Sequence, residues 1–404
     1  MNLDVRTMGL THITTVPVSL RFLRGQVSYM RGRGFEVEAI SSPGSELTEF
    51  GDFEGIDVHA VEMPRRITPF NDLRAGYNLY RKLQNIQPTI VHAHTPKGGL
   101  LGMITGWFSR TPVRIYHIRG LPYMSATGRR RALLKATERI SCTLADRVIC
   151  VSHSIRDVAV SDGLCAPAKI VVFAGGSGNG VDANGQFSIH RFTEREISSK
   201  RAELGFHEGE VVIGFVGRIV RSKGIEELAQ AWQVLRESHP RARLLLVGPV
   251  EPQDPVSDVA ISLLQNDPRV IITGWVPDTG VYYSVIDLVV LPTYREGFPN
   301  VPLEAAAMGK PVVATQIPGC IDAVHDGVTG ILVPAHDVQT LGFAIQRYLD
   351  HPDLRKQHGS AGRERVLRDF RQEVIWEAIY QEYCRLLTEK GLPTPKQQAA
   401  ATSM

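Results

Sequence analysis

Two blocks of alternating strand-like and helix-like segments constrain the fold of this 404-residue chain more than any other feature. Each block contains short runs rich in Val and Ile, separated by longer stretches of helical periodicity. This alternation is typical of βαβ units, which build a parallel sheet covered by helices on both faces. A single hydrophobic core stops growing near roughly 250 to 300 residues, so the length also favours two domains. We therefore predict an α/β protein with two doubly wound sheets.

The predicted strands and boundaries follow from these blocks. The first block predicts strands at 10–16, 35–41, 89–94, 113–118, 147–152 and 169–174. The second predicts strands at 211–217, 242–248, 270–275, 288–293, 311–316 and 330–335. Between them, GGSGNGVDANGQF (175–187) is dense in Gly and Asn and predicts a hinge. We expect an N-terminal domain at 1–180, a C-terminal domain at 188–370, a helix at 371–390 that crosses back, and a disordered tail at 391–404.

Composition narrows the class of protein. A hydrophobic content of 43% and a charged content of 22% are typical of soluble globular proteins, and no run of 18 apolar residues predicts a membrane span. Five cysteines without a CxxC pair indicate neither a disulfide framework nor a zinc site, which favours a reducing cytoplasm. Residues 1–185 carry 22 Lys and Arg against 15 Asp and Glu, whereas the remainder carries 23 against 27. The first half is therefore basic, and nothing in the composition demands nucleic acid.

The first candidate loop follows the strand at 211–217. In open α/β sheets, ligands bind beyond the carboxyl ends of the strands. Arg218 and Lys223 flank this loop, and a helix is predicted to begin near Ile225. The amides and the dipole of a helix N-terminus favour an anion, and two added cations suit a diphosphate. The alternative is an ordinary solvated pair of basic side chains.

The second candidate loop, EGFPN at 296–300, separates Glu296 from Glu304. Val301–Pro302 predicts the start of a helix, because Pro is tolerated in a first turn, and this start places Glu304 in that turn. One interpretation is that Glu304 complements the helix dipole and Glu296 is a solvated charge. The other is that both carboxylates accept hydrogen bonds from vicinal sugar hydroxyls, since ionised acceptors form the stronger hydrogen bonds.

Two histidines in VHAHT, His92 and His94, raise the question of a metal. With no carboxylate near them in the sequence, a structural role or contact with an acceptor is favoured over a metal site.

Several motifs together resemble a known enzyme family. EGFPNVPLEA, GRIVRSKG and LVVLPTYREG resemble the retaining glycosyltransferases of family 4, which have the GT-B fold of two Rossmann-like domains facing across a cleft. HAHTPKGGLLG (92–102), GLPYMSATGRRRALLKATER (120–139) and GSGNGVD (176–182) resemble the branch that builds bacterial capsular polysaccharide, exopolysaccharide and O-antigen.

The resemblance implies a role for each candidate residue. It implies that Arg218 and Lys223 grip the donor diphosphate, that Glu304 holds the ribose and that Glu296 contacts the transferred sugar. The backbone of Gly297, Phe298, Pro299 and Asn300 would hold the sugar and phosphate. The segment at Gly25 resembles the family's N-domain loop that lies beneath the donor phosphates. Many members carry a His where this chain has Arg119, and His117 lies two residues earlier on the same predicted face. Either residue is therefore a candidate for the catalytic position.

The implied activity is that of a retaining hexosyltransferase. The resemblance implies transfer of a hexose or N-acetylhexosamine from a nucleoside-diphosphate sugar, with uridine expected, to a polyprenyl-diphosphate-linked glycan, without a metal or other cofactor. Two alternatives are a sugar-nucleotide 2-epimerase and an inactive donor-binding subunit. The helix predicted at 128–139 carries Arg129, Arg130, Arg131, Lys135 and Arg139, with Arg65, Arg66 and 74–82 as an extension. These cations predict peripheral attachment to the anionic inner face of the plasma membrane, against the alternative of an ordinary solvated helix face.

Overall fold

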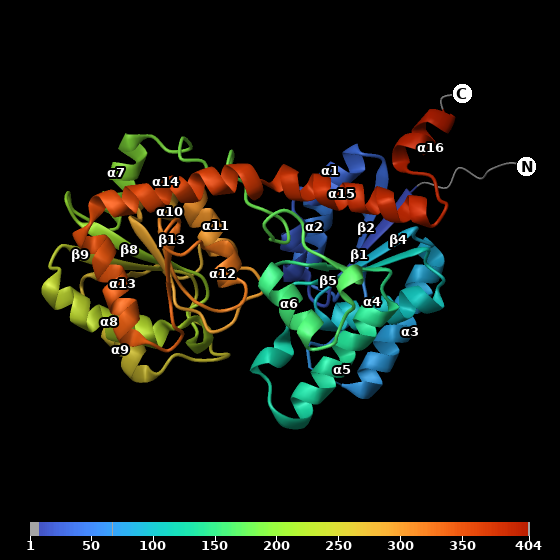
Figure 1. Ribbon diagram of the computed structural model, residues 1–404, viewed down its shortest axis with the longest axis horizontal. Coiled ribbons are helices and arrows are strands. Elements are labelled where there is room, and N and C mark those ends of the chain that lie inside the picture. Colours follow the sequence, from blue (N-terminus) through green and yellow to red (C-terminus); the bar gives the residue numbers. More distant parts are fainter. Residues whose placement is uncertain (1–7, 67, 403–404) are drawn as a thin grey trace, which may run out of the picture. The chain divides into compact units, whose positions relative to one another are not determined.

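The computed structural model describes residues 8–66 and 68–402, and the chain forms two compact units (Figure 1). The first unit comprises Met1–Asn179 together with Gln372–Met404, and the second comprises Gly180–Arg371. The chain thus passes from one unit to the next at Asn179, inside the predicted hinge at 175–187.

The first unit is built on a seven-stranded parallel sheet in the order β3-β2-β1-β4-β5-β6-β7. Its strands are β1 (Met8–Ile13), β2 (Phe35–Ser41), β3 (Val58–Ala60), β4 (Ile90–His94), β5 (Val113–Ile118), β6 (Arg147–Cys150) and β7 (Ile170–Val171). The order reverses direction beside β1, where β2 lies on one side and β4 on the other. In a doubly wound sheet this switch point is where ligand-binding loops gather.

Helices cover both faces of the first sheet (Figure 1). One face packs against α1 (Gln26–Gly32), α2 (Ser45–Glu54) and the C-terminal α15 (Gln372–Glu389). The other packs against α3 (Pro69–Ile86), α4 (Pro96–Phe108), α5 (Gly128–Leu144) and α6 (His153–Ser161). Alternate residues of the buried strands enter the two cores, as period-two side-chain alternation requires.

The second unit contains a six-stranded parallel sheet in the order β10-β9-β8-β11-β12-β13. Its strands are β8 (Val211–Val216), β9 (Ala242–Val247), β10 (Val270–Ile272), β11 (Leu288–Leu291), β12 (Val312–Thr315) and β13 (Gly330–Val333). Its helices are α7 (Glu194–Glu203), α8 (Ile225–Ser238), α9 (Asp258–Gln265), α10 (Gly280–Val285), α11 (Asn300–Ala307), α12 (Cys320–Ala323), α13 (Val338–Asp350) and α14 (Pro352–Asp369). The sheet residues form the centre of one continuous hydrophobic core.

All twelve predicted strands are present, most of them shorter at their ends than expected. The sequence analysis missed β3, a three-residue strand that pairs only with β2 and has no fully buried residue. The prediction of a disordered tail at 391–404 was wrong in part, because Pro395–Thr402 forms α16. Pro395 is buried and lies close to Gly34, which anchors the start of this helix.

The chain returns to the first unit through α15, as the prediction of a helix crossing back requires. Ile379, Tyr380 and Tyr383 are buried on one face of α15, and Trp376 Nε1 donates a hydrogen bond to Asn179 Oδ1 at 2.7 Å. Among the described residues, every helix is too short or too polar to cross a bilayer.

Candidate active site

Two loops of the second unit meet at the carboxyl edge of its sheet. Strands β8 and β11 are hydrogen-bonded neighbours, so the loops that follow them emerge side by side. The backbone confirms this, because Tyr294 N–H donates to the Ser222 carbonyl at 3.0 Å. The segment GRIVRSKG and the segment YREGFPN, which were predicted separately, therefore form one site.

Lys223 and Glu296 form an ion pair within this site. Lys223 ends a short 3-10 helix, Arg221–Lys223, and Glu296 lies in the loop after β11. Their side chains are only 20% and 14% exposed, so the pair is partly desolvated. Gly224, next to Lys223, has a φ of 71°, and a Cβ there would lie 2.0 Å from the Pro292 carbonyl oxygen. Glycine therefore permits the close approach that brings Lys223 beside the end of β11.

Arg218 lies two residues after the end of β8, and its side chain is largely exposed. Its guanidinium pairs with Glu251 at 2.9 Å, while its side chain stays 57% exposed. An exposed ion pair is weak and salt-sensitive, so a phosphate can displace Glu251 at little cost. The structure thus places both predicted diphosphate ligands at the same sheet edge.

Glu304 lies deeper than the sequence predicted. Helix α11 begins at Asn300 with Pro299 as its N-cap, so Glu304 is the fifth helical residue and its position in the first turn was a wrong prediction. The Tyr283 hydroxyl donates to Glu304 Oε2 at 2.8 Å. Burial raises the pKa of Glu304 to about 7, although the Tyr283 hydrogen bond opposes this shift. Burial therefore favours the protonated form of this carboxyl, and its ionised form is the stronger hydrogen-bond acceptor.

A second glycine, Gly319, allows its segment to pack closely against the EGFPN loop. Gly319 has a φ of 86°, and a Cβ on it would lie 2.6 Å from the Gly297 carbonyl oxygen. The Phe298 ring packs against Phe370 with centroids 5.6 Å apart, and Pro299 is buried. Asn300 is exposed at the start of α11, where helix amides favour an anion. The loop is therefore supported by packing on its inner side, with Asn300 in solvent.

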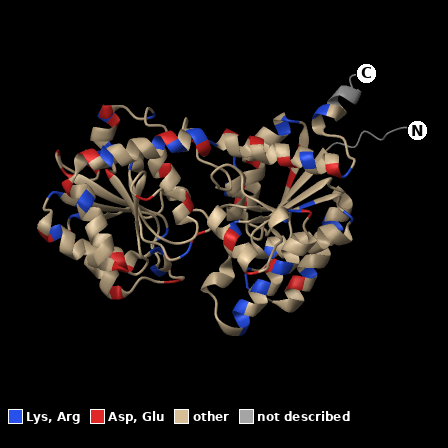
Figure 2. Ribbon diagram, viewed as in Figure 1, with Lys and Arg blue, Asp and Glu red and all other residues tan. Residues whose placement is uncertain are grey.

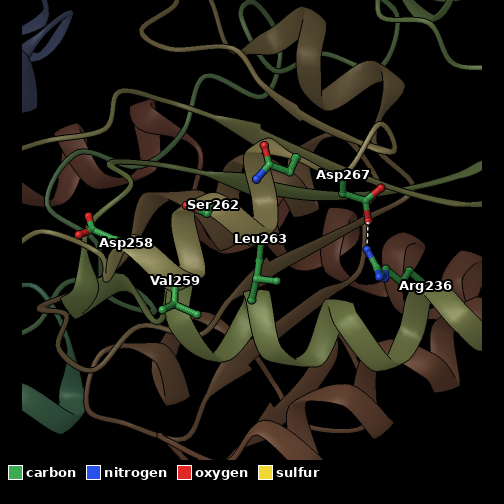
Figure 3. A pocket seen from close by; sticks show the side chains of 7 residues that line it. Arg236, Asp258, Val259, Ser262, Leu263 and Asp267 are labelled. Atoms are coloured by element: carbon green, nitrogen blue, oxygen red, sulfur yellow. Dashed lines mark hydrogen bonds and ion pairs between the residues drawn. The ribbon is translucent and has the colours of Figure 1, made fainter.

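The second unit also has a surface groove of about 480 Å³ that contains none of the predicted residues (Figure 3). It lies between α8 and α9 and is lined by Arg236, Asp258, Val259, Ser262, Leu263, Asn266 and Asp267. Arg236 is paired with Asp267 at 3.1 Å, which leaves no free cation for a phosphate in this groove. We therefore place the candidate site at the loops after β8 and β11 and not in this groove.

Four histidines form a buried cluster on one face of the first sheet. In register, His12 of β1 lies beside His92 of β4, and His94 lies beside His117 of β5. All four are at most 1% exposed and lie on the face that α15 covers, where Tyr383 Oη is 2.6 Å from His92 Nδ1. Sequence analysis missed His12, because only the register of the sheet brings it beside residues 80 positions away.

Arg119 sets the direction of the hydrogen bonds in this cluster. Its Nε donates to His94 Nδ1 at 3.3 Å, since a guanidinium can only donate. Burial lowers the pKa of His94 well below its usual value and that of His12 to about 3, so both rings are neutral. A neutral His94 that accepts at Nδ1 carries its proton on Nε2, which then donates to His12 Nδ1 at 3.0 Å. His12 consequently carries its proton on Nε2.

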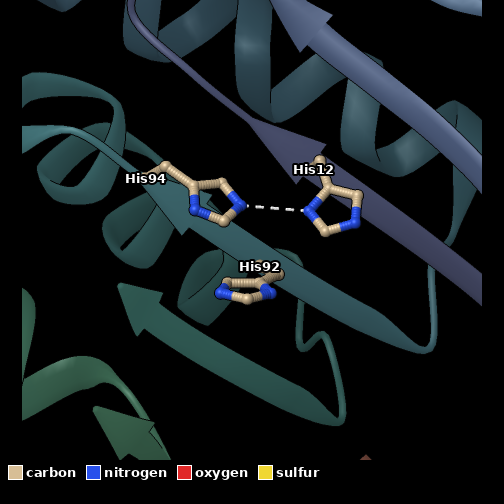
Figure 4. A group of neighbouring side chains, drawn as sticks. All are labelled: His12, His92 and His94. Atoms are coloured by element: carbon tan, nitrogen blue, oxygen red, sulfur yellow. Dashed lines mark hydrogen bonds between the residues drawn. The ribbon is translucent and has the colours of Figure 1, made fainter. Parts of the chain in front are cut away.

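The direction of these hydrogen bonds decides whether the histidine cluster can hold a metal ion. Ring nitrogens of His12, His92 and His94 lie within 4.8 Å of one another (Figure 4), a spacing at which they could bind one metal ion. However, the His94 nitrogen that faces His12 carries a proton, and a metal ligand needs a lone pair. The Arg119 cation stands beside the group, and the cluster contains no carboxylate to offset added charge. The donor set fits a hydrogen-bonded network better than a metal centre.

The structure separates the two candidates for the catalytic position in the first unit. His117 is 1% exposed and stacks on His92 with ring centroids 5.3 Å apart. Arg119 lies beyond the end of β5, partly exposed, with its guanidinium 5.1 Å from the Phe22 ring centre. A Cβ on Gly178 would lie 2.1 Å from Arg119 Nη1, so glycine makes room for this side chain. Of the two, only Arg119 lies beyond its strand and is partly exposed.

Gly25 caps α1 with a φ of 75°, but its amide is already used. Gly25 N–H donates to Glu54 Oε1 at 2.8 Å, and Ser28 N–H and Oγ donate to Glu54 Oε2 at 3.2 and 2.9 Å. The buried Glu54 carboxylate therefore occupies the helix N-terminus that the resemblance assigned to a phosphate. Contact between Gly25 and a donor stays a prediction that requires Glu54 to move.

Comparison with known proteins identifies the family of this chain. A family profile described as "Glycosyl transferases group 1" matches residues 210–351, and one described as "Glycosyl transferase 4-like domain" matches residues 20–176. The capsular polysaccharide biosynthesis glycosyltransferase CapM of Staphylococcus aureus is 31% identical over 388 residues, which cover 95% of this chain and 99% of CapM. The chain belongs to glycosyltransferase family 4.

Other relatives of this glycosyltransferase agree with the assignment. The Escherichia coli UDP-Gal:alpha-D-GlcNAc-diphosphoundecaprenol alpha-1,3-galactosyltransferase is 24% identical over 321 residues, covering 78% of this chain and 80% of that enzyme. Anabaena HepE, solved in complex with UDP and glucose, superposes with a TM-score of 0.78 at 20% identity over 94% of this chain and 100% of HepE. A Rickettsia africae glycosyltransferase gives 0.79 at 19% identity over 95% and 99%. These structures confirm the GT-B class with two Rossmann-like domains.

Proposed function

We propose that this glycosyltransferase moves a hexose or N-acetylhexosamine from a UDP-sugar to a polyprenyl-diphosphate-linked glycan, with retention at the anomeric carbon, in bacterial surface polysaccharide synthesis. The observation that carries the proposal is that two cations, Arg218 and Lys223, and two carboxylates, Glu296 and Glu304, lie on the loops and helices after the neighbouring strands β8 and β11. Cations suit a diphosphate, and carboxylates suit the hydroxyls of ribose and sugar.

In this proposal the ion pair of Lys223 and Glu296 opens when the donor binds. Lys223 turns to the diphosphate, and Glu296 accepts hydrogen bonds from sugar hydroxyls. Both side chains are then matched by the substrate, so neither charge is left buried and unpaired. Arg218 exchanges its exposed partner Glu251 for a phosphate oxygen. Glu304 holds the ribose diol in its ionised form.

The chemical step proceeds on one face of the sugar. The bond from the anomeric carbon to the diphosphate oxygen breaks, and the bond to the acceptor oxygen forms on the same face. The acceptor hydroxyl gives its proton to the departing diphosphate. Lys223 and Arg218 stabilise the negative charge that grows on that group, and preorganised charges of this kind are often the largest single catalytic contribution. The two cations supply the charge that some enzymes obtain from a metal, so the proposal is metal-independent.

Support for the acceptor and the location comes from the relatives and from charge. The named substrate of the Escherichia coli relative is a diphosphoundecaprenol glycan, and CapM is named for capsule synthesis. Lys and Arg gather along α5 in the first unit (Figure 2), and Arg129, Arg130 and Arg131 are exposed in its first turn. Lys135 pairs with Asp162 at 2.7 Å, and Arg139 donates to the Gly163 carbonyl, so the three arginines carry the proposed attachment to the inner face of the plasma membrane.

A panel of nucleotide sugars incubated with the pure protein tests this function. We expect one UDP-sugar to release free UDP slowly, and faster when a diphosphate-linked glycan acceptor is added, with the product retaining the donor's anomeric configuration by NMR. Formation of an epimeric nucleotide sugar without UDP release would support the epimerase alternative. Donor binding without any turnover would support an inactive subunit.

A further inference from the structure

The outer face of α3 carries an unusual set of side chains. Phe70 is 89% exposed, Leu73 74% and Tyr77 61%. At 100° per residue these three lie within one stripe, and Arg74 and Arg81, both exposed, share it. The opposite stripe of α3 packs into the core of the first unit through Ala75, Leu79 and Leu83. The helix is thus apolar on both sides, and its outer apolar stripe is bordered by arginines.

The start of α3 is held firmly. Thr68 is the N-cap residue, and its N–H and hydroxyl donate to the Asp72 carboxylate at 3.1 and 3.3 Å. Lys97 at the start of α4 pairs with Asp72 at 2.7 Å and donates to the Arg66 carbonyl. Asp72 is the only acid in α3, and this pairing offsets its charge. Phe70 and Leu73 are therefore presented by an anchored helix.

Topology places the start of this stripe at the carboxyl edge of the first sheet. Helices α3, α4 and α5 each follow a strand of a parallel sheet, so all three begin at its carboxyl edge. Helix α4 packs against both α3 and α5. Phe70 and Leu73, the exposed Arg65 and Arg66 before them, and the first turn of α5 therefore gather at the same edge.

We infer that α3 is a membrane-insertion element, in which Phe70, Leu73 and Tyr77 enter the headgroup region of an anionic bilayer while Arg74 and Arg81 contact lipid phosphates. An exposed stripe that combines aromatic side chains with arginines is the signature of a helix that lies in a membrane interface. A second copy of this chain is a poor occupant, because two such basic faces repel each other. The inference rests on the proposed function, since a lipid-linked acceptor is what brings the enzyme to a membrane.

Insertion and electrostatic attachment respond differently to salt, which allows a sharp test. Binding of the whole protein to vesicles of phosphatidylcholine with phosphatidylglycerol is measured by sedimentation at low and high salt. We expect Arg129→Gln, Arg130→Gln and Arg131→Gln together to weaken binding mainly at low salt. We expect Phe70→Ser with Leu73→Ser to remove the salt-resistant binding, with a loss of at least about tenfold, because apolar burial is not screened. Phe343→Ser, which changes a 60% exposed Phe of α13 in the other unit, is the matched control and should leave binding unchanged.

A second readout reports depth directly. Phe70→Trp should add a fluorescence component that shifts to the blue and is quenched by brominated lipid when vesicles are added, and Phe343→Trp should not. UDP release from the donor without vesicles should be the same for Phe70→Ser, Leu73→Ser and wild type. Equal sedimentation of that double variant and wild type at both salt concentrations, with no blue shift at position 70, would overturn the inference. Failure of donor turnover with vesicle binding intact would instead count against the proposed function alone.

Discussion

Lys223 and Glu296 pair across two neighbouring strand ends, one from the loop after β8 and the other from the loop after β11. Neither is fully exposed, so each maintains the other in a partly desolvated position. A donor that carries both a diphosphate and hydroxyls matches both partners at once. A free phosphate matches only Lys223 and would leave Glu296 without its cation.

Replacing Lys223 tests the catalytic assignment. Lys223→Ala should lower kcat by about a hundredfold or more, because one preorganised charge on the leaving group is lost. The melting temperature should fall by no more than a few degrees, because Glu296 loses its cation but the lysine contributes no core packing. Arg221→Ala is the matched control, because Arg221 belongs to the same 3-10 helix and is 57% exposed. Equal turnover of Lys223→Ala and wild type would refute the assignment.

Glu304 gives the site a pH dependence of known sign. Its pKa is raised to about 7 in the folded chain, against 4.5 as the ordinary value. In the proposed site the ionised carboxylate accepts hydrogen bonds from the ribose hydroxyls, so donor affinity should rise by about tenfold from pH 6 to pH 8. A nucleotide sugar is the right titrant, because its doubly esterified diphosphate keeps its charge in this range. Glu304→Gln, which preserves a partner for Tyr283, should bind more weakly and without this pH dependence. An identical pH profile for the two proteins would contradict the role.

The same shift predicts how stability varies with pH. A carboxyl whose pKa is higher in the folded than in the unfolded chain contributes its full stabilisation at a pH below its pKa in the unfolded chain. This contribution is lost as the pH rises through its pKa in the folded chain. Between pH 5 and pH 8, wild type should therefore lose a few degrees of melting temperature relative to Glu304→Gln. Calorimetry of both proteins across that range is the measurement, and parallel curves would argue against a raised pKa.

Arg119 should control the tautomers of the histidine cluster. In nitrogen-15 NMR, His94 and His12 should each show the proton on Nε2 in wild type, because Arg119 donates to His94 Nδ1. Arg119→Ala should allow His94 to take the other tautomer and should lower kcat more than His117→Gln does. Lysine at position 119 retains the charge without the planar fork, so it should restore activity only in part. Unchanged His94 signals in Arg119→Ala would show that the tautomer is set by another group.

The neutral network also predicts behaviour toward metals. Cobalt(II) added to wild type should give no absorption bands of a histidine-bound ion, and chelator should leave donor turnover intact. Stoichiometric cobalt binding that disappears in His92→Gln would show instead that His12, His92 and His94 form a metal centre.

The sequence predicted the fold well because βαβ alternation is a local signal that burial reinforces. It missed β3 because three residues at a sheet edge carry no pattern. The cations and carboxylates of the second unit could be found because each lies in the loop or the first helix after β8 or β11, and parallel topology brings strand ends together. Their partners Glu251 and Tyr283 could not be found from the sequence, because these residues belong to other segments of the second unit.

The exposed stripe of α3 and the histidine cluster show a further limit. An amphipathic pattern places Leu79 and Leu83 inside, but it cannot say that Phe70 remains outside, since apolar residues are usually buried. His12 and His94 are adjacent only through sheet register, and Tyr383 reaches His92 from a helix 291 residues away. Such contacts are set by tertiary packing and leave no trace in local periodicity.

Hydrogen exchange with and without a saturating UDP-sugar tests the central claim most directly, because it locates the donor. Residues 217–225 and 293–304 should exchange more slowly when the donor is bound, since it covers the loops after β8 and β11, and Lys223→Ala should reduce this protection. Residues 258–267, which line the groove between α8 and α9, should be unaffected. Protection confined to that groove, or no protection at 217–225 and 293–304, would contradict the account.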